Sequence, residues 1–225
     1  MKVKVTIPTS LKEIKLSQYQ KFLKILNENE ESEFLSLKMI EIFCGVSLNV
    51  ANSMAKKDLN EATRIIGELF TKVPPLIKQF EFEGQTFGFH PNLDELSSGE
   101  YMDLDNYSTA KDWQDMHYAL GVLYRPITKT QKDKYLIEPY ESARKYGEAF
   151  KHMSLEIALS AIVFFYRLGN DLLISTMDSL MANQVGLPKL GNSENDGGGI
   201  PLSMDLLREM LGDLMKLQNY QYTNA

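Results

Sequence analysis

Acidic side chains gather in one short stretch of this sequence, "FGFHPNLDELSSGEYMDLDNYS", residues 87–108. It holds five carboxylates, one histidine and a Gly-Glu-Tyr step. Two carboxylates at a fixed separation can act as general acid and base, and acids at alternate positions can bind calcium. The stretch could therefore be a metal loop, a pair of catalytic acids, or only the connection between a hairpin and a helix.

A calcium loop of the EF-hand type has acids at alternate positions, a glycine at the sixth position and a glutamate at the twelfth. Counted from Asp103, an acid recurs at the third position, Asp105. The fifth, sixth and twelfth positions are instead Tyr107, Ser108 and Gln114. The EF-hand pattern is therefore not met.

A catalytic pair could combine Glu100 with Asp103 or Asp105, but nearby acids are common in any acidic chain and nothing in the sequence shows that two of these carboxylates converge. A structural interpretation has its own mechanism. Ser97 or Ser98 can cap a helical turn, and Glu100, three residues after Ser97, would complete a capping box at the positive end of that helix. We favour this interpretation and predict no catalytic residue here.

Other motifs that could carry chemistry are missing from the sequence. His90, His117 and His152 are far apart, and no HExxH pattern is present. No P-loop or dinucleotide-binding motif occurs, and the glycines at 197–199 are typical of a linker. We therefore predict no metal-binding residue, no cofactor and no enzymatic activity.

Composition limits the classes of partner. The chain has 225 residues and a net charge of -6, which argues against nucleic acid as a partner because phosphate binding needs a cationic surface. The single cysteine, Cys44, excludes an internal disulfide framework and a cysteine-rich zinc site. We expect synthesis in a reducing cytoplasm.

The sequence also argues against a membrane protein. The opening "MKVKVTIPTS" lacks the apolar region of a signal peptide. The most apolar stretch, "LEIALSAIVFFY", has about a dozen residues, and a bilayer-spanning helix needs roughly 20. We predict a soluble protein with no membrane span.

The patterning predicts a mainly α protein with one small β-hairpin and a tethered C-terminal amphipathic helix. The alternating aromatic runs Phe80/Phe82 and Phe87/Phe89 around Glu83-Gly84-Gln85 predict the hairpin, near residues 78–90, with its phenylalanines on one buried face. "KVKVTIP" predicts a short N-terminal strand. "KDWQDMHYALGVLYRPI" predicts a helix that ends at Arg125-Pro126, and "TKTQKDKYLIEPYE" is polar and then briefly extended.

Three segments are expected along the chain. Residues 1–186 form the helical domain with its hairpin. Residues 187–200 are rich in Gly, Asn and Ser and predict a flexible linker. Residues 201–218 form the amphipathic helix, which could dock on its own domain or on a neighbour.

Two regions are candidates for binding a partner protein. Tyrosine and arginine are enriched at interfaces, which draws attention to Tyr124, Arg125, Tyr135 and Tyr140. The alternative, an ion pair from Arg125 to Glu138 within one domain, is equally compatible with the sequence.

The C-terminal helix is the second candidate region. Its apolar stripe includes Leu206, Met210 and Leu214 and must be buried against another surface.

Several stretches resemble small proteins from the structural and assembly gene clusters of tailed bacteriophages, in particular crAss-like and other phages of Bacteroidetes hosts. The resemblance spans roughly residues 5 to 180 and rests on "TIPTSLKEIKLSQYQKFLKI", "GEYMDLDNY", "DWQDMHYALGVLYRPI", "YLIEPYE" and "FFYRLGNDLL". It implies a tail, neck or cargo protein of the virion, made in the bacterial host cytoplasm.

The expected partners are other phage structural proteins (tail, neck or portal components), and the chain could also form a homo-oligomer. A tail assembly chaperone that does not stay in the virion is the second candidate. The third, least favoured, is a small hydrolase or nuclease that uses the acids near residue 100.

Overall fold

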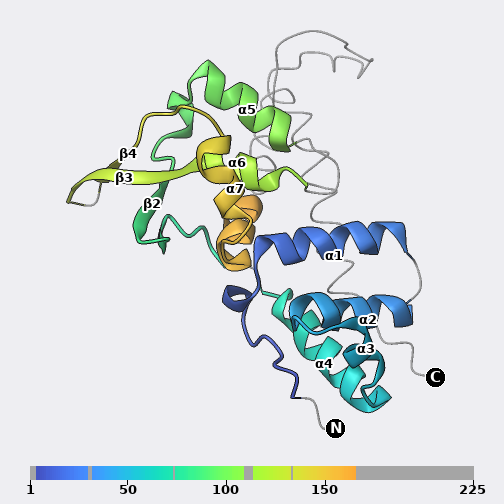
Figure 1. The fold of residues 1–225 in the computed structure, drawn as a ribbon. Coiled ribbons are helices and arrows are strands. Elements are labelled where there is room, and N and C mark those ends of the chain that lie inside the picture. The colour runs from blue at the N-terminus through green and yellow to red at the C-terminus, as the bar shows by residue number, and fades with distance from the viewer. Residues whose placement is uncertain (1–3, 30–31, 73, 109–113, 133, 166–225) are drawn as a thin grey trace, which may run out of the picture.

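The computed structural model describes residues 4–29, 32–72, 74–108, 114–132 and 134–165 (Figure 1). The linker expected at 187–200 and the helix expected at 201–218 lie outside these residues. The elements, in chain order, are η1 (Leu11–Glu13), α1 (Leu16–Glu28), α2 (Ser32–Phe43), α3 (Leu48–Asn52), α4 (Lys56–Leu69), β1 (Gln79–Phe82), β2 (Gln85–Phe89), η2 (Leu93–Glu95), α5 (Ser98–Ser108), α6 (Met116–Leu123), β3 (Tyr124–Gln131), β4 (Lys134–Ile137) and α7 (Arg144–Phe150). Residues 155–165 are also helical.

Helices α1 to α4 lie on one side of the molecule and the sheet on the other, with α7 between them (Figure 1). The helices are held by an aromatic core, because α1, α2 and the end of α4 each place rings inside. Tyr19 stacks on Phe70 with ring centroids 5.7 Å apart, and Phe22 lies 5.2 Å from Phe43. All four rings are buried.

The start of α1 is joined to a distant part of the chain by backbone hydrogen bonds. The N–H of Leu16 donates to the carbonyl of Met153 (3.0 Å), and the N–H of Ser17 donates to the carbonyl of Lys151 (2.9 Å). The N–H of Leu155 in turn donates to the carbonyl of Ile14 (2.8 Å). Segments about 140 residues apart therefore satisfy each other's backbone groups.

The phenylalanine hairpin is confirmed. β1 pairs with β2 in antiparallel register, with Phe80 opposite Phe87, and the two turn residues Glu83 and Gly84 have φ values of 49° and 77°. Positive φ at both positions is the signature of a type I′ turn, which glycine adopts without steric cost. The rings of Phe80 and Phe87 stack at 5.7 Å and both contact Phe150 of α7.

The prediction of a mainly α domain with one hairpin is wrong. The strands form a four-stranded antiparallel sheet in the order β1-β2-β3-β4, so the protein is a mixed α/β fold. The missing half is a second hairpin, in which β3 pairs with β4 through Thr130 opposite Tyr135 and Gln131 opposite Lys134. The turn residue Lys132 of this hairpin has a φ of 54°. The sequence at this turn is not the Asn-Gly pair that usually identifies a hairpin.

Pro126 lies within a strand, although proline usually ends a regular element or stays at a sheet edge. It lies inside β3 opposite Phe87, and its carbonyl accepts a hydrogen bond from the N–H of Glu138 (2.8 Å). The nitrogen and the carbonyl of a strand residue point to the same neighbouring strand, so the ring nitrogen of Pro126 also faces the side of β4. On that side β4 ends at Ile137, before it reaches Pro126. A bulge comes directly after it, between Ile127 and Lys129. The N–H that proline lacks is therefore missing only at the end of the pairing between β3 and β4.

The predicted N-terminal strand is also wrong for the described part of "KVKVTIP", because residues 4–9 have no regular secondary structure. An alternating pattern forms a strand only where a partner strand is available. Val5 and Ile7 instead pack individually against the core.

Helices α6 and α7 cross at two glycines. A methyl group on Gly121 would lie 2.5 Å from the carbonyl oxygen of Ala143, and one on Gly147 would lie 2.5 Å from Cδ1 of Tyr118 and 3.0 Å from its Cα. Real Cβ atoms do not approach backbone so closely, so the crossing requires hydrogen at both positions.

We expect Gly121→Ala to destabilise the fold by about 1–3 kcal/mol, because the added methyl group must push α7 away from α6. The measurement is the free energy of unfolding from urea titration. Gly99→Ala is the matched control, since its methyl group would meet only Cε1 of Tyr140 at 4.0 Å. An equal loss of stability in both variants would contradict the proposed close contact.

Candidate functional site

The acidic stretch at 87–108 forms the link between the sheet and α5. The N–H of Ser97 donates to Oε2 of Glu100 (2.7 Å), and the N–H of Glu100 donates back to Oγ of Ser97 (3.3 Å). This reciprocal pair is the predicted capping box, which is confirmed. The hydroxyl of Ser97 also donates to Oε2 of Glu100 (2.6 Å), so this carboxylate oxygen is fully engaged.

The second oxygen of Glu100 faces the sheet. Nη2 of Arg125 in β3 donates to Oε1 of Glu100, and each side chain of this ion pair is only 6% exposed. Nε of Arg125 is buried and has no hydrogen-bond partner among the described residues. The guanidinium charge therefore depends on Glu100 for its neutralisation.

His90 completes the charged cluster. Its Nε2 lies 3.6 Å from Oε1 of Glu100, and its Nδ1 accepts a hydrogen bond from the N–H of Asn92 (3.3 Å). An accepting Nδ1 assigns the proton of the neutral ring to Nε2, which then faces the carboxylate.

Tyr140 covers the other side of the cluster. The guanidinium of Arg125 lies 5.5 Å from the centre of the Tyr140 ring, a cation–π contact, and the Tyr140 hydroxyl donates to Oδ2 of Asp103. Burial and this hydrogen bond to Asp103 raise the pKa of Tyr140 above its usual value. The segment after β4 is thereby attached to α5.

The electrostatics of the cluster favour a charged Glu100 and a neutral His90. Burial raises the pKa of Glu100, but the hydrogen bonds from Ser97 and the charge of Arg125 outweigh it, so the pKa is below the usual value. Burial lowers the pKa of His90, and the charge of Glu100 only partly opposes this. A carboxylate with a lowered pKa is a weak base at neutral pH, which suits a structural role better than general acid–base catalysis.

Among the described residues, no group of three or more His, Cys, Asp or Glu side chains could hold a metal ion. The described helices likewise include none that is long and apolar enough to cross a membrane.

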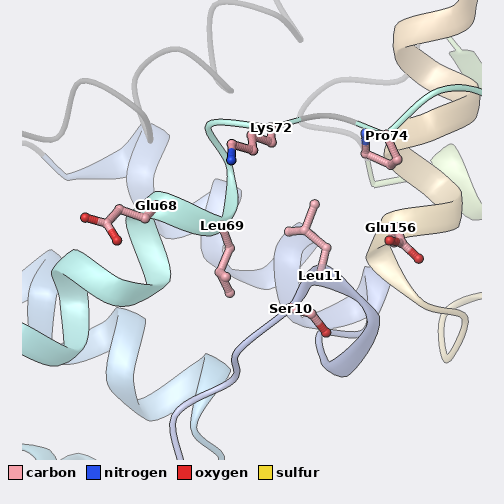
Figure 2. Close-up of a pocket in the computed structure, with 7 residues that line it drawn as sticks. All are labelled: Ser10, Leu11, Glu68, Leu69, Lys72, Pro74 and Glu156. Carbon is pink, nitrogen blue, oxygen red and sulfur yellow. The ribbon is translucent and has the colours of Figure 1, made fainter.

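One cavity, of about 360 Å³, carries two carboxylates outside the cluster. Figure 2 shows Glu68 and Glu156 on opposite sides of this cavity, with Leu11 and Leu69 between them. Glu68 pairs with Arg64 of its own helix. The two carboxylates do not converge, so they do not form a catalytic pair.

The tyrosines and the arginine that were expected to bind a partner mostly contact their own chain. Tyr124 is fully buried and its hydroxyl donates to the carbonyl of Ile77 (2.8 Å), while Arg125 is buried against Glu100. Tyr135 is half-buried, and its hydroxyl donates to the carbonyl of Phe89 (2.7 Å) across Gly88, where a methyl group would collide with its ring.

The alternative ion pair between Arg125 and Glu138 is replaced by the one with Glu100. Glu138 instead accepts hydrogen bonds from Lys145 (3.0 Å) and from the Tyr146 hydroxyl (2.5 Å). Leu206, Met210 and Leu214 lie outside the described residues. The cluster partners Arg125, His90 and Tyr140 were not predicted, because no local signal in the sequence pairs them with residues of α5.

The chain was compared with protein families, curated proteins and solved structures, and no family, curated protein or solved structure matches it.

We expect Glu100→Gln to lower the free energy of unfolding by about 3–5 kcal/mol, because it leaves the Arg125 charge buried without a counter-ion. Urea unfolding at neutral pH measures the change. Asp94→Asn removes the same charge from the same stretch at an exposed position, and it should change stability by about 0.5 kcal/mol or less. A Glu100→Gln variant as stable as Asp94→Asn would contradict a structural role for the ion pair.

Stability should fall on acidification. His90 and His117 both have pKa values lowered by burial, so the unfolded chain binds protons more readily than the folded chain below about pH 6.5. The lowered pKa of Glu100 adds a second loss as pH falls below about 4.5 toward its folded pKa.

We therefore expect the urea midpoint to drop between about pH 7.5 and pH 5.5, and to drop less in His90→Gln. The exposed His152→Gln serves as the control and should keep the full drop. The same drop in all three proteins would show that His90 does not contribute.

Proposed function

We propose that the chain is a non-enzymatic structural or packaged protein of a tailed bacteriophage virion, in the tail, in the neck or as cargo. It acts through contacts with other phage structural proteins and is made in the host cytoplasm. The observation that carries the non-enzymatic part is the burial of Glu100 between Ser97 and Arg125. The strongest candidate for a catalytic acid is thus engaged in holding α5 on the sheet.

The hydrolase or nuclease alternative loses support from the same geometry. Asp103, the second candidate acid, accepts a hydrogen bond from Tyr140. Replacing Glu100 and Asp103 would consequently test folding and not catalysis. Glu100, with two donors from Ser97, one from Arg125 and a lowered pKa, offers little to a substrate.

The phage assignment rests on the resemblance of several stretches, above all "GEYMDLDNY" and "DWQDMHYALGVLYRPI". The described surface is compatible with contacts to other proteins. Tyr101 and Met102 are neighbours on α5 and are 44% and 63% exposed, and Leu136 on the outer strand β4 is 60% exposed. Large apolar side chains of this kind are released from water when a partner docks.

Mass spectrometry of purified particles from the phage that encodes this chain tests the proposal. We expect its peptides at a fixed ratio to the major capsid protein in independent, gradient-purified preparations. An abundant non-structural phage protein from the same lysate is the control and should be lost during purification. Presence in the lysate but absence from mature particles would contradict a virion role and would favour the assembly chaperone.

A further inference from the structure

A lysine-lined cavity lies where α1 meets the start of α6 and the end of α7. It has a volume of about 440 Å³, and the residues that line it are Ser17, Gln20, Lys21, Lys24, Gln114, Asp115, His117, Tyr118 and Lys151. The positions from α1 follow a helical spacing and therefore share one face of that helix. Three lysines face one aspartate, in a chain whose net charge is -6.

Two of the lysines have no counter-ion in the part of the chain that the structure describes. Lys21 and Lys24 are exposed and form no ion pair among the described residues. Lys151 is different, because its Nζ lies 2.7 Å from Oε2 of Glu148. The cavity therefore presents two ammonium groups that are available to an external anion.

His117 supplies a buried donor at the same place. Its Nδ1 lies 3.3 Å from Nε2 of Gln20, and the Gln20 amide also donates to the carbonyl of Gln114 (3.2 Å). The Gln20 contact makes Nδ1 the acceptor and assigns the proton of the neutral ring to Nε2, while the carbonyl of Gln114, which also lies beside the ring, favours the protonated imidazole. Nε2 is buried and has no hydrogen-bond partner among the described residues, although the side chain lines the cavity and is only 2% exposed.

We infer that this cavity, bounded by Lys21, Lys24 and His117, binds an acidic segment of a partner protein. A carboxylate side chain would accept from the ammonium groups, and charge complementarity would set the orientation of docking. The inference rests on the proposed function and narrows it, because it assigns a chemical class to the partner surface.

Other anions fit less well. Sites for small phosphates typically use the arginine fork or backbone N–H groups of glycine-rich loops, and the described residues of the lining include no arginine and no glycine. A nucleic-acid strand would meet the overall negative charge of the chain and the carboxylate of Asp115. Flexible lysines around an amide and an imidazole suit a solvated carboxylate on a protein surface.

The test is a peptide titration of the full chain at about 50 mM salt, where surface charges are weakly screened. The probe is a labelled, acetylated peptide of alternating Gly and Glu, and the matched probe carries Gln in place of Glu. Fluorescence anisotropy gives Kd, and the imidazole resonances of His117 report on the cavity itself. We expect the Glu peptide to bind and to shift these resonances, and the Gln peptide to do neither.

The variant Lys21→Gln/Lys24→Gln should raise the Kd of the Glu peptide about 3- to 30-fold. The control Lys56→Gln/Lys57→Gln removes two exposed lysines from α4 and leaves the net charge equal to that of the first variant. It should change Kd by less than about twofold. Equal weakening in both variants would overturn the inference, since attraction would then be non-specific.

Inorganic phosphate that shifts the His117 resonances as strongly as the Glu peptide would also overturn it, because the cavity would then be a small-anion site. The titration uses the isolated chain, so its failure is distinct from failure of the virion proposal. If the chain were absent from particles, selective binding of the Glu peptide would still stand. If the chain bound the Glu and Gln peptides equally, its detection in particles by mass spectrometry would still stand.

Discussion

Glu100 and Arg125 form a buried ion pair at the point where α5 meets the sheet, and most of the site geometry depends on it. Removing a carboxylate and a guanidinium from water costs several kcal/mol each, and mutual attraction offsets this only when other donors and acceptors are satisfied. Ser97 satisfies the second carboxylate oxygen, and the ring of Tyr140 covers the guanidinium. The same contact therefore orients α5, β3 and the segment after β4.

Local features of this region were predictable from the sequence because their partners are close along the chain. Ser97 and Glu100 are three residues apart, which is the spacing of a capping box, and Glu83-Gly84 separates two aromatic runs. The pairing of Glu100 with Arg125 spans 25 residues. No periodicity or motif connects two positions so far apart, so only the fold could reveal that the candidate acid Glu100 is buried against Arg125.

The second hairpin shows how one residue can hide an element. Arg125-Pro126 correctly suggests that a helix stops nearby, since α6 ends at Leu123. The next element is a strand, because Tyr124 enters the core on the sheet and Pro126 directs its nitrogen toward the end of β4. The polar run after Pro126 faces solvent on an outer hairpin, where the lack of hydrophobic alternation removes the usual strand signal.

Charged side chains have different roles in two parts of the molecule. Two acids of the 87–108 stretch act inward, because Glu100 neutralises Arg125 and Asp103 accepts a hydrogen bond from Tyr140. Lys21 and Lys24 on α1 have no such internal partner among the described residues, so their charge remains outward. In an acidic chain, two exposed ammonium groups beside a buried imidazole concentrate attraction for anions at one place. Charge thus stabilises the fold at the Glu100–Arg125 pair, whereas at the cavity beside Lys21 and Lys24 it is available for binding an acidic partner.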